Sequence, residues 1–327
     1  MDQDLVDVVG VGNAIVDVIS QATDDFVLAQ GLEKGSMTLI NQDRATQLYE
    51  LMGPGIEASG GSAANTVAGV TSFGGTASFI GKVRDDVLGS VFAHDMRASG
   101  VRFDLEPSDQ GPDTARCLIL VTPDAQRTMN TFLGISSLLE PTDIEPAAVD
   151  SGQILFCEGY LWDVDSAKQA IRKAMDIARA AGRRVAFTAS DSFCVERHHQ
   201  EFLDLVAGPI DILFANLAEL ATLYECDFDT AVEKIRGDVA LGCLTRGDQG
   251  SILVSGSETI EIAAENLGPV VDTTGAGDQY AAGVLFALAR NMDLADAGRL
   301  GSLAAAEVIS HVGPRPQRPL SELLDLV

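Results

Sequence analysis

The second half of the chain alternates short apolar runs with longer stretches of helical periodicity, and this alternation constrains the fold most strongly. The apolar runs predict strands at 154–157, 184–188, 210–215, 241–245 and 251–255. The periodic stretches predict helices at 165–181, 197–206, 217–236, 278–290 and 296–311. Strands that alternate with helices form a mostly parallel sheet covered by helices on both faces. We therefore expect a doubly wound α/β fold.

The first half of the chain follows the same rhythm with one departure. The regular elements are strands at 5–11 and 77–80 and helices at 43–52, 66–73 and 88–99. The departure is a predicted hairpin, in which residues 114–121 and 127–132 flank the turn at Pro123-Asp124. No internal repeat and no clear linker interrupts the chain, so we expect a single domain over residues 1–327.

Composition limits the partners and the compartment. With 46% hydrophobic residues, a chain of 327 residues can bury a sizeable core. The net charge of −26 argues against nucleic acid or an anionic membrane as a partner, because either would need a basic face. The five cysteines form no C-x-x-C pair, and no apolar run is long enough to span a membrane. Because the N-terminus is acidic and lacks a basic leader, we expect a cytoplasmic protein.

A glycine-rich turn, Asp272-Thr273-Thr274-Gly275-Ala276-Gly277-Asp278, runs directly into an apolar helix. Such a turn presents unpaired N–H groups at the positive end of the helix, which is a site for an anion such as phosphate. A carboxylate beside that site is repelled by its own ligand. Asp278 would be useful there as a base that takes a proton from an attacking hydroxyl. The alternative is that Asp278 only stabilises the first turn of a core helix, and this stretch alone favours neither.

A second glycine turn, Gly60-Gly61-Ser62-Ala63-Ala64-Asn65, also precedes an apolar helix. Paired glycines let a ligand approach the backbone closely, and the Asn65 amide can both donate to and accept from hydroxyls. A tight strand–helix connection would explain the same residues. Asp17 lies after the Gly12-Asn13 pair and could accept from two vicinal hydroxyls of a sugar, or it could be a solvent-facing strand residue.

Three further elements allow both a functional and a purely structural interpretation. Asn216 and Glu219 follow a predicted strand and could organise hydrated Mg²⁺, or could form a capping box at a helix start. The stretch Thr245-Arg246-Gly247-Asp248-Gln249-Gly250 could cradle a nucleotide or could be a hairpin turn. Arg127 could clamp a phosphate or could be an exposed basic residue.

Other patterns carry little functional weight. Gly10-Val11-Gly12 follows a strand, but Ile15 stands at the third glycine position and more strand follows, so a dinucleotide site is not expected. His198-His199 has poor spacing for a metal, and we interpret it as a solvated helix start. No Gly-x-Ser-x-Gly elbow supports a serine hydrolase.

Taken together, these residues resemble the PfkB (ribokinase-like) family of carbohydrate and nucleoside kinases. Its two signatures look like residues 60–73 with 81–89, and residues 272–283. Both stand in the family's order and spacing, the second is highly specific, and the resemblance covers nearly the whole chain. The sequence departs from the family pattern at Arg84, where glycine is frequent, and at Tyr280, where phenylalanine is usual.

Within the family, the likeness is greatest to adenosine kinases, through residues 12–17, residues 211–216 with Glu219, and the segment around Arg127. The resemblance implies a ribokinase-like fold with a small, discontinuous β-lid. We expect the lid to come from roughly 14–41 and 104–134.

The resemblance also implies a role for each candidate residue. Asp278 would be the catalytic base, Gly275, Ala276 and Gly277 the anion hole, and Arg127 the lid residue that closes over the phosphates. The acceptor's hydroxyls would be bound by Asn13, Asp17, Gly60, Gly61 and Asn65. The nucleotide would be bordered by Asn216, Thr245, Gly247 and Gly250, with Glu219 holding Mg²⁺ through water.

The expected function is ATP-dependent phosphorylation of a primary hydroxyl, with adenosine ahead of a free sugar as acceptor. The alternatives are a sugar kinase of ribokinase or fructokinase type and a non-catalytic nucleoside- or sugar-binding protein of this fold; a dinucleotide oxidoreductase is the most distant. An adenine platform would come from Tyr160-Leu161-Trp162 or Phe132-Leu133, which would equally suit a core. The requirement for a monovalent cation and the choice between monomer and homodimer stay open.

Overall fold

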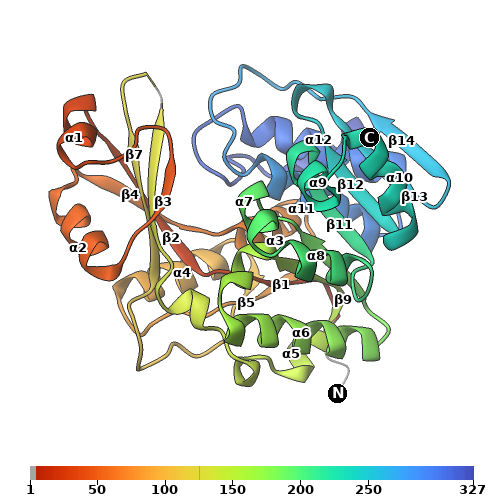
Figure 1. Cartoon of the computed structure of the whole chain (residues 1–327), viewed down its shortest axis with the longest axis horizontal. Coiled ribbons are helices and arrows are strands. Elements are labelled where there is room, and N and C mark those ends of the chain that lie inside the picture. Colours follow the sequence, from red (N-terminus) through yellow and green to blue (C-terminus); the bar gives the residue numbers. More distant parts are fainter. Residues whose placement is uncertain (1–4, 125) are drawn as a thin grey trace.

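The computed structural model describes residues 5–124 and 126–327, which form a large and a small β-sheet with surrounding helices (Figure 1). The acidic N-terminal residues and position 125 of the expected hairpin segment lie outside the described residues. Figure 1 shows the small sheet on the left, beside the larger layered unit that holds most of the helices. None of the described helices is both long enough and apolar enough to cross a membrane.

The large sheet has nine strands in the order β14-β13-β12-β11-β10-β9-β1-β5-β6. Its strands are β1 (Val6–Val11), β5 (Ala77–Ile80), β6 (Val101–Arg102), β9 (Gly152–Glu158), β10 (Arg184–Thr188), β11 (Ile212–Asn216), β12 (Leu241–Thr245), β13 (Ser251–Ser255) and β14 (Glu258–Ile262). All neighbours from β12 to β6 pair in parallel, and only β13 and β14 are antiparallel. The mostly parallel, doubly wound fold is therefore confirmed.

Helices cover both faces of the large sheet. One face carries α3 (Ser62–Ser72), α4 (Val87–Ala98), α11 (Ala276–Ala289) and α12 (Leu294–Val308). The other face carries α5 (Pro146–Asp150), α6 (Asp165–Ala180), α7 (Ser192–Arg197), α8 (His199–Val206), α9 (Leu217–Tyr224) and α10 (Phe228–Asp238). Alternate residues of one strand point to opposite faces. In β9, Leu155 and Cys157 accordingly join the core under α6, whereas Ile154 and Phe156 join the core under α3 and α11.

Helices α11 and α12 pack unusually closely. A Cβ at Gly283 would lie 2.6 Å from the backbone nitrogen of Gly301, so the two helix backbones approach each other through these glycines. Eleven residues of α11 are buried, from Gln279 to Ala289. The start of α11 is thus held rigidly against the sheet.

The small sheet has five strands in the order β3-β8-β7-β2-β4. They are β2 (Ile15–Gln21), β3 (Met37–Leu39), β4 (Gly55–Gly60), β7 (Ala115–Val121) and β8 (Arg127–Phe132). Strands β7 and β8 form the expected antiparallel hairpin, and β7 pairs in parallel with β2. Helices α1 (Asp24–Ala29) and α2 (Gln42–Leu51) connect these strands.

Strand β4 was not predicted from the sequence. The sequence analysis assigns Gly60 to the second glycine turn and no element to residues 55–59, but Gly55–Gly60 pair along β2 from Ile15↔Gly60 to Ser20↔Gly55. The segment contains two glycines and little apolar content, so it carries no strand signal of its own. Its pairing with β2 comes from tertiary structure, and the small sheet therefore draws on a segment outside 14–41 and 104–134.

Candidate active site

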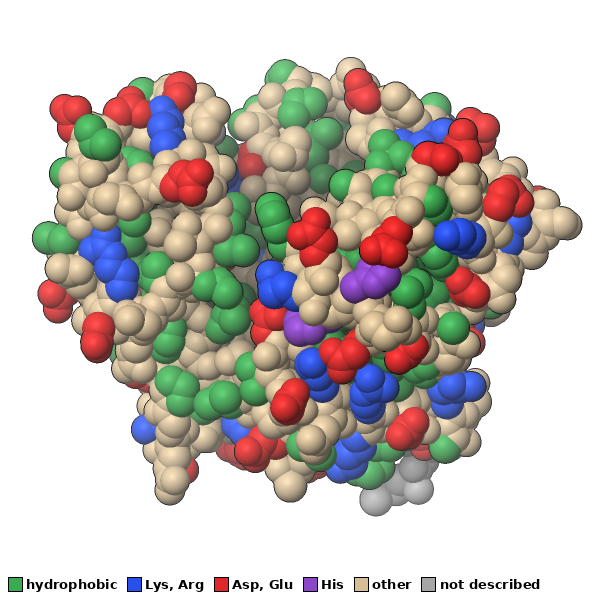
Figure 2. Space-filling view, in the orientation of Figure 1, with side chains coloured by type: hydrophobic (Ala, Val, Ile, Leu, Met, Phe, Trp, Pro, Cys, Tyr) green, Lys and Arg blue, Asp and Glu red, His purple; other side chains and the backbone are tan. Residues whose placement is uncertain are grey.

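A cleft of about 1060 Å³ lies where the small sheet meets the carboxyl ends of the large sheet's strands. The molecule is hollowed there in the space-filling view (Figure 2). The residues at or just beyond these strand ends that line the cleft are Asn13, Glu158, Thr188, Asn216 and Thr245. Ligands of open α/β sheets bind outside the carboxyl ends of the strands, next to the point where strand order reverses. Here β1 is that point, with β9 on one side and β5 on the other.

Asp278 lies in the first turn of α11 and faces helix α3. Ser62 Oγ donates to Asp278 Oδ1 at 2.7 Å, and Asn65 Nδ2 donates to Asp278 Oδ2 at 3.0 Å. Gly275 occupies the N-cap position with φ +79°, and no side chain caps the helix. The Asp278 carboxylate therefore binds side chains of another helix instead of serving as the N-cap of its own helix. Burial raises the pKa of Asp278, while the bonds from Asn65 and Ser62 and the charge of Arg315 oppose that rise.

The glycine turn before α11 offers N–H groups toward the cleft. Among the described residues, no acceptor is found for the N–H groups of Gly275 and Gly277, whereas Ala276 N donates to Thr273 O at 3.2 Å. A Cβ at Gly277 would meet no protein atom within 4 Å, so this position is open to a ligand. The two free N–H groups at the positive end of α11 suit an anion.

Arg315, in the C-terminal tail, sets the orientation of Asn65 and was not identified from the sequence. Its Nε donates to Asn65 Oδ1 at 3.2 Å, which leaves Asn65 Nδ2 to donate to Asp278. Burial lowers the pKa of Arg315 to about 10, although the carboxylates of Asp17, Asp95 and Asp278 favour its charged form. A lone arginine in a proline-rich tail carries no local signal for this role.

Asp17, on β2 of the small sheet, faces the cleft and is not a solvent-facing strand residue. Its carboxylate lies against Gly60, where a Cβ would be 2.4 Å from Asp17 Oδ2. Burial raises the pKa of Asp17 to about 7, partly opposed by Arg315 and Arg127 and increased by Asp278. Gly60 therefore makes room for a half-buried carboxylate in the cleft wall.

Asn13 and Gly61 lie together at the floor of the cleft. Gly61 has φ +98°, and a Cβ there would be 2.3 Å from Asn13 O, so only glycine fits this turn. Ser136 Oγ donates to Asn13 Oδ1 at 2.8 Å. Asn13 in turn donates to Glu158, a fully buried carboxylate that the sequence analysis did not single out.

Arg127 is not an exposed basic residue. Its side chain is only 12% exposed; one guanidinium nitrogen lies 2.6 Å from Asp272 Oδ2, and the other donates to Thr274 Oγ1 at 3.2 Å. Arg127 belongs to β8, so these contacts join the small sheet to the glycine turn before α11. A planar, permanently charged guanidinium in that position suits a phosphate group.

Asn216 and Glu219 form a complete capping box at the start of α9. Asn216 N and Nδ2 donate to the Glu219 carboxylate at 2.9 and 2.6 Å, and Glu219 N donates to Asn216 Oδ1 at 2.9 Å. Both residues also line the cleft, together with Asp191. Burial raises the pKa of Glu219 to about 7, and Asp191 adds to the shift.

The donor set fits Mg²⁺ held through water. Within the described residues, no cluster of three His, Cys, Asp or Glu could hold a metal by itself. Mg²⁺ keeps several waters and needs few carboxylates when phosphate oxygens complete its coordination. Glu219 and Asp191 supply oxygen ligands of the right type beside the cleft, while the contacts between Glu219 and Asn216 favour an interaction through water.

The stretch 245–250 forms a hairpin turn between β12 and β13. Arg246 N donates to Gly250 O at 2.7 Å, and a Cβ at Gly250 would lie 2.0 Å from Ile262 O. Gly250 is therefore required by the turn itself. Thr245 lines the cleft, and Gly247 is open to solvent, since a Cβ there would meet nothing within 4 Å.

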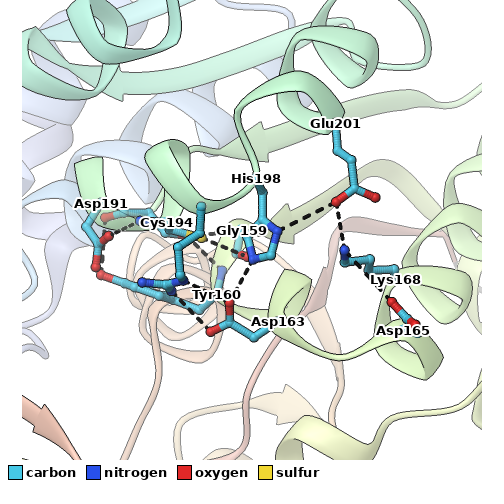
Figure 3. A network of polar contacts seen from close by, with 11 residues as sticks. Gly159, Tyr160, Asp163, Asp165, Lys168, Asp191, Cys194, His198 and Glu201 are labelled. Atoms are coloured by element: carbon cyan, nitrogen blue, oxygen red, sulfur yellow. Dashed lines mark hydrogen bonds and ion pairs between the residues drawn. The ribbon is translucent and has the colours of Figure 1, made fainter.

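The wall formed by η3 (Gly159–Asp163), α7 and α8 holds a polar network that sequence reasoning missed (Figure 3). His198 lies between Asp163 and Glu201, with Nε2 at 2.7 Å from Asp163 Oδ1. Its side chain is 12% exposed, so the expectation of a solvated helix start was wrong for His198. The Asp163 carboxylate also accepts from Arg197, which lines the cleft.

Apolar side chains from two sides also line the cleft, and we call this set the apolar chamber. Phe193 of α7 is 69% exposed and lines the cleft with Tyr160 and Phe214. The small sheet and the residue following it contribute Ile15, Met37, Leu39, Ile119, Met129 and Leu133. Of the expected platform residues, Tyr160 and Leu133 line the cleft, whereas Leu161, Trp162 and Phe132 are buried. The cleft thus combines the polar residues at the strand ends, which we call the polar floor, with the apolar chamber.

A protein-family model matches most of the chain. Residues 56–320 match the model of the pfkB family carbohydrate kinases. This chain belongs to that family. Its members are named as kinases, and the family implies ATP as phosphate donor, so the chain is a phosphotransferase of the PfkB type.

Curated relatives of this chain are named as sugar kinases. The 5-dehydro-2-deoxygluconokinase of Shouchella clausii is 28% identical over 82% of this chain and 86% of that protein. Fructokinase-2 of Solanum habrochaites is 25% identical over 75% of this chain and 77% of that protein.

Two proteins of solved structure are more similar in sequence to this chain than these curated relatives are. The adenosine kinase from Sinorhizobium meliloti has a TM-score of 0.91 and 50% identity, covering 98% of this chain and 99% of that one. A probable sugar kinase from Rhizobium etli has a TM-score of 0.92 and 45% identity, covering 99% of both chains. Adenosine kinases at 21–22% identity share the fold. The chain therefore has the ribokinase-like architecture, which these relatives combine with different acceptors.

Proposed function

We propose that this protein transfers the γ-phosphoryl group of ATP to the primary hydroxyl of adenosine. The observation that carries this proposal is that apolar side chains line the cleft together with the polar residues of its floor. A free sugar has hydroxyls on every side and gains little from such walls, whereas a purine base buries its faces against aromatic and aliphatic side chains. The 50% identity to an adenosine kinase over nearly the whole chain supports the same acceptor.

The polar floor would hold the ribose. In this arrangement Asp17 accepts from the vicinal hydroxyls, while Asn13 and Asn65 bind further hydroxyls and Gly60 and Gly61 let the sugar approach the backbone. Burial raises the pKa of Asp17 to about 7, although the charges of Arg315 and Arg127 favour the ionised carboxylate. Hydroxyl donors would stabilise its charged form.

Asp278 would take the proton from the attacking hydroxyl. Its pKa is raised by burial, and a base works best when its pKa lies near the working pH. Ser62 and Asn65 hold both carboxylate oxygens, so the base is oriented before the acceptor arrives. A positioned base contributes about 10²–10⁴ in rate.

The transferred phosphoryl group would be stabilised by the N–H groups of Gly275 and Gly277 and by Arg127. Ala276 would join them if its 3.2 Å bond to Thr273 O opens. Phosphoryl transfer depends mostly on positioning and charge stabilisation, so these donors supply the main catalytic effect. The small sheet would act as a lid that excludes water, which otherwise competes as acceptor.

The nucleotide would lie along Asn216, Thr245 and Gly247, with Gly250 shaping the turn. Bound Mg²⁺ would neutralise phosphate charge, and Glu219 with Asp191 would hold its waters. Dependence of turnover on K⁺ against Na⁺ tests for a monovalent cation in the same assay.

A sugar kinase is the second candidate, because curated relatives are named for fructose and 5-dehydro-2-deoxygluconate phosphorylation. ADP release with Mg-ATP is measured for adenosine, inosine, ribose, fructose and 5-dehydro-2-deoxygluconate. We expect adenosine to give the highest kcat/KM. Turnover of any sugar without turnover of nucleosides would refute the adenosine proposal, and no ADP release above background with any acceptor would support a non-catalytic binding protein.

A further inference from the structure

Glu158 is a buried carboxylate whose contacts all lead to the acceptor side of the cleft. It is the last residue of β9 and is 0% exposed. Its Oε1 accepts from Asn13 N and Asn13 Nδ2, each at 2.8 Å, and its Oε2 accepts from Ala63 N at 2.8 Å. One side chain from β9 therefore ties Asn13, two residues beyond β1, to the start of α3.

The contact with Ala63 gives helix α3 a cap from outside its own sequence. The N-cap residue of α3 is Gly61, which has no side chain to satisfy the first N–H groups. Such groups need a partner when they are buried. Glu158 provides it and so fixes the first turn of α3, which carries Ser62 and Asn65.

Ser62 and Asn65 are the two residues that hold Asp278. Glu158 thus reaches the proposed base through one helical turn and reaches the acceptor through Asn13. The position of Glu158 also explains why residue 12 is glycine, because a Cβ there would lie 2.4 Å from Glu158 Oε2. The Gly10-x-Gly12 pattern is accounted for without a dinucleotide.

We propose that Glu158 is a positioning residue for phosphoryl transfer: it orients Asn13 toward the acceptor and, through the capped start of α3, orients Ser62 and Asn65 against Asp278. This inference rests on the proposed kinase function and adds a residue to it. An ionised carboxylate can accept from all three N–H groups at once. Burial raises the pKa of Glu158 to about 7, opposed by the bonds from Ala63 and Asn13 and increased by Asp278.

Glu158→Gln tests the proposal, because the amide keeps the shape and has one acceptor oxygen in place of two. At least one N–H group then faces another donor. We expect kcat to fall about 10–100-fold, since small displacements of reacting groups have effects of this size. The acceptor KM should rise about 3–10-fold while the ATP KM stays within about 2-fold, because Asn13 and α3 serve the acceptor side.

Cys157→Ala is the matched control. Cys157 precedes Glu158, is fully buried, and faces the core on the opposite side of the sheet. It should lower Tm and leave both KM values and kcat within about 2-fold of wild type. The proposal would be overturned if Glu158→Gln, measured at a temperature at which it is folded, had the same kcat and KM values as the wild-type protein.

A double-mutant cycle separates positioning from a general loss of structure. If Glu158 acts through α3, Asn65→Ala should reduce kcat much less in the Glu158→Gln background than in wild type. Losses in kcat that multiply would contradict the proposal.

If Glu158→Gln does not fold, Ser136→Ala replaces it. That variant removes the bond to Asn13 Oδ1 and should raise the acceptor KM about 3-fold with Tm within about 2 °C; an unchanged KM would overturn the inference.

The wild-type acceptor panel separates this inference from the proposed function. Absence of turnover with every acceptor counts against the kinase proposal alone. The inference is then decided by calorimetry with adenosine and ribose as probes. We expect acceptor Kd to weaken about 3–10-fold in Glu158→Gln, and an unchanged Kd overturns the inference.

Discussion

The proposed acceptor side and the proposed nucleotide side of the cleft are built in different ways. On the acceptor side, Asp17, Asn65 and Asp278 come from β2, α3 and α11, and the hydrogen bond from Asn65 to Asp278 spans more than 200 positions of the chain. On the nucleotide side, Asn216 with Glu219 and the turn at 245–250 satisfy their own polar groups within a few residues.

The two sides should therefore respond differently to substitution. Local caps and turns form wherever their short sequence is intact. The acceptor side depends on the packing of several elements at once, and it concentrates carboxylates in a buried space. Such groups raise the free energy of the folded state unless a ligand or a partner stabilises their charge. We therefore expect substitutions on the acceptor side to affect chemistry most and substitutions on the nucleotide side to have milder, metal-linked effects.

The largest effect is expected for Asp278→Asn. The amide cannot take the proton, so kcat should fall about 10²–10⁴-fold while acceptor Kd by calorimetry changes by less than about 3-fold. Ser72→Ala, at the end of α3 and away from the cleft, is the control. Retention of most of the turnover in Asp278→Asn would remove Asp278 from the role of base.

The next effect is expected for Asp17→Asn. Loss of a charged acceptor for two hydroxyls should weaken acceptor binding by about 10–100-fold, in line with about 1.5–3 kcal/mol for a hydrogen bond to a charged group. Calorimetry with adenosine measures this directly. An unchanged acceptor Kd would show that Asp17 does not bind the diol.

A smaller effect is expected for Glu219→Gln, which tests the nucleotide side. The apparent Mg²⁺ requirement should rise about 10-fold, while the acceptor Kd stays unchanged. Mg²⁺ titrations at fixed ATP measure it, with Glu196→Gln on the exposed surface of α7 as the control. Equal Mg²⁺ dependence in both variants would show that Glu219 does not bind Mg²⁺ and serves only in the capping box of α9.

The smallest effect concerns stability and pH. The folded-state pKa of Asp17 is raised to about 7 from 3.8, so its protonation stabilises the folded state fully below pH 3.8, and this stabilisation is lost as pH rises through 7. Asp17→Asn removes the charge, so it should raise Tm by about 2–5 °C at pH 8 and less at pH 5.5. Thermal unfolding at both pH values measures it; an equal shift at both would contradict a buried, charged Asp17.

Much of the fold was predictable because its signals are local. Short segments of the sequence predict the alternating strands and helices, the β7–β8 hairpin and both glycine turns, and the structure confirms them. Strand β4 escaped prediction because a glycine-rich edge segment becomes a strand only when β2 offers a partner. The position of Asp278 at the start of α11 was also local, whereas its contacts with Ser62 and Asn65 join residues more than 200 positions apart.

Residues without a local motif could not be found from the sequence. Glu158 follows an ordinary buried strand, and Arg315 stands in an irregular tail. Their importance arises from what lies opposite them: Asn13 and Ala63 for Glu158, and Asn65 for Arg315.

Periodicity, glycine turns and capping act over a few residues, so the sequence alone specifies the layered α/β architecture, the glycine-rich start of α11 and the set of polar residues offered to a ligand. How those residues face one another depends on packing between segments that are far apart in the sequence. The apolar chamber of the cleft and the buried network around Glu158 exist because separate strands and helices converge at one edge of the sheet. Long-range packing therefore decides the shape of the acceptor site, and local sequence decides the chemistry available within it.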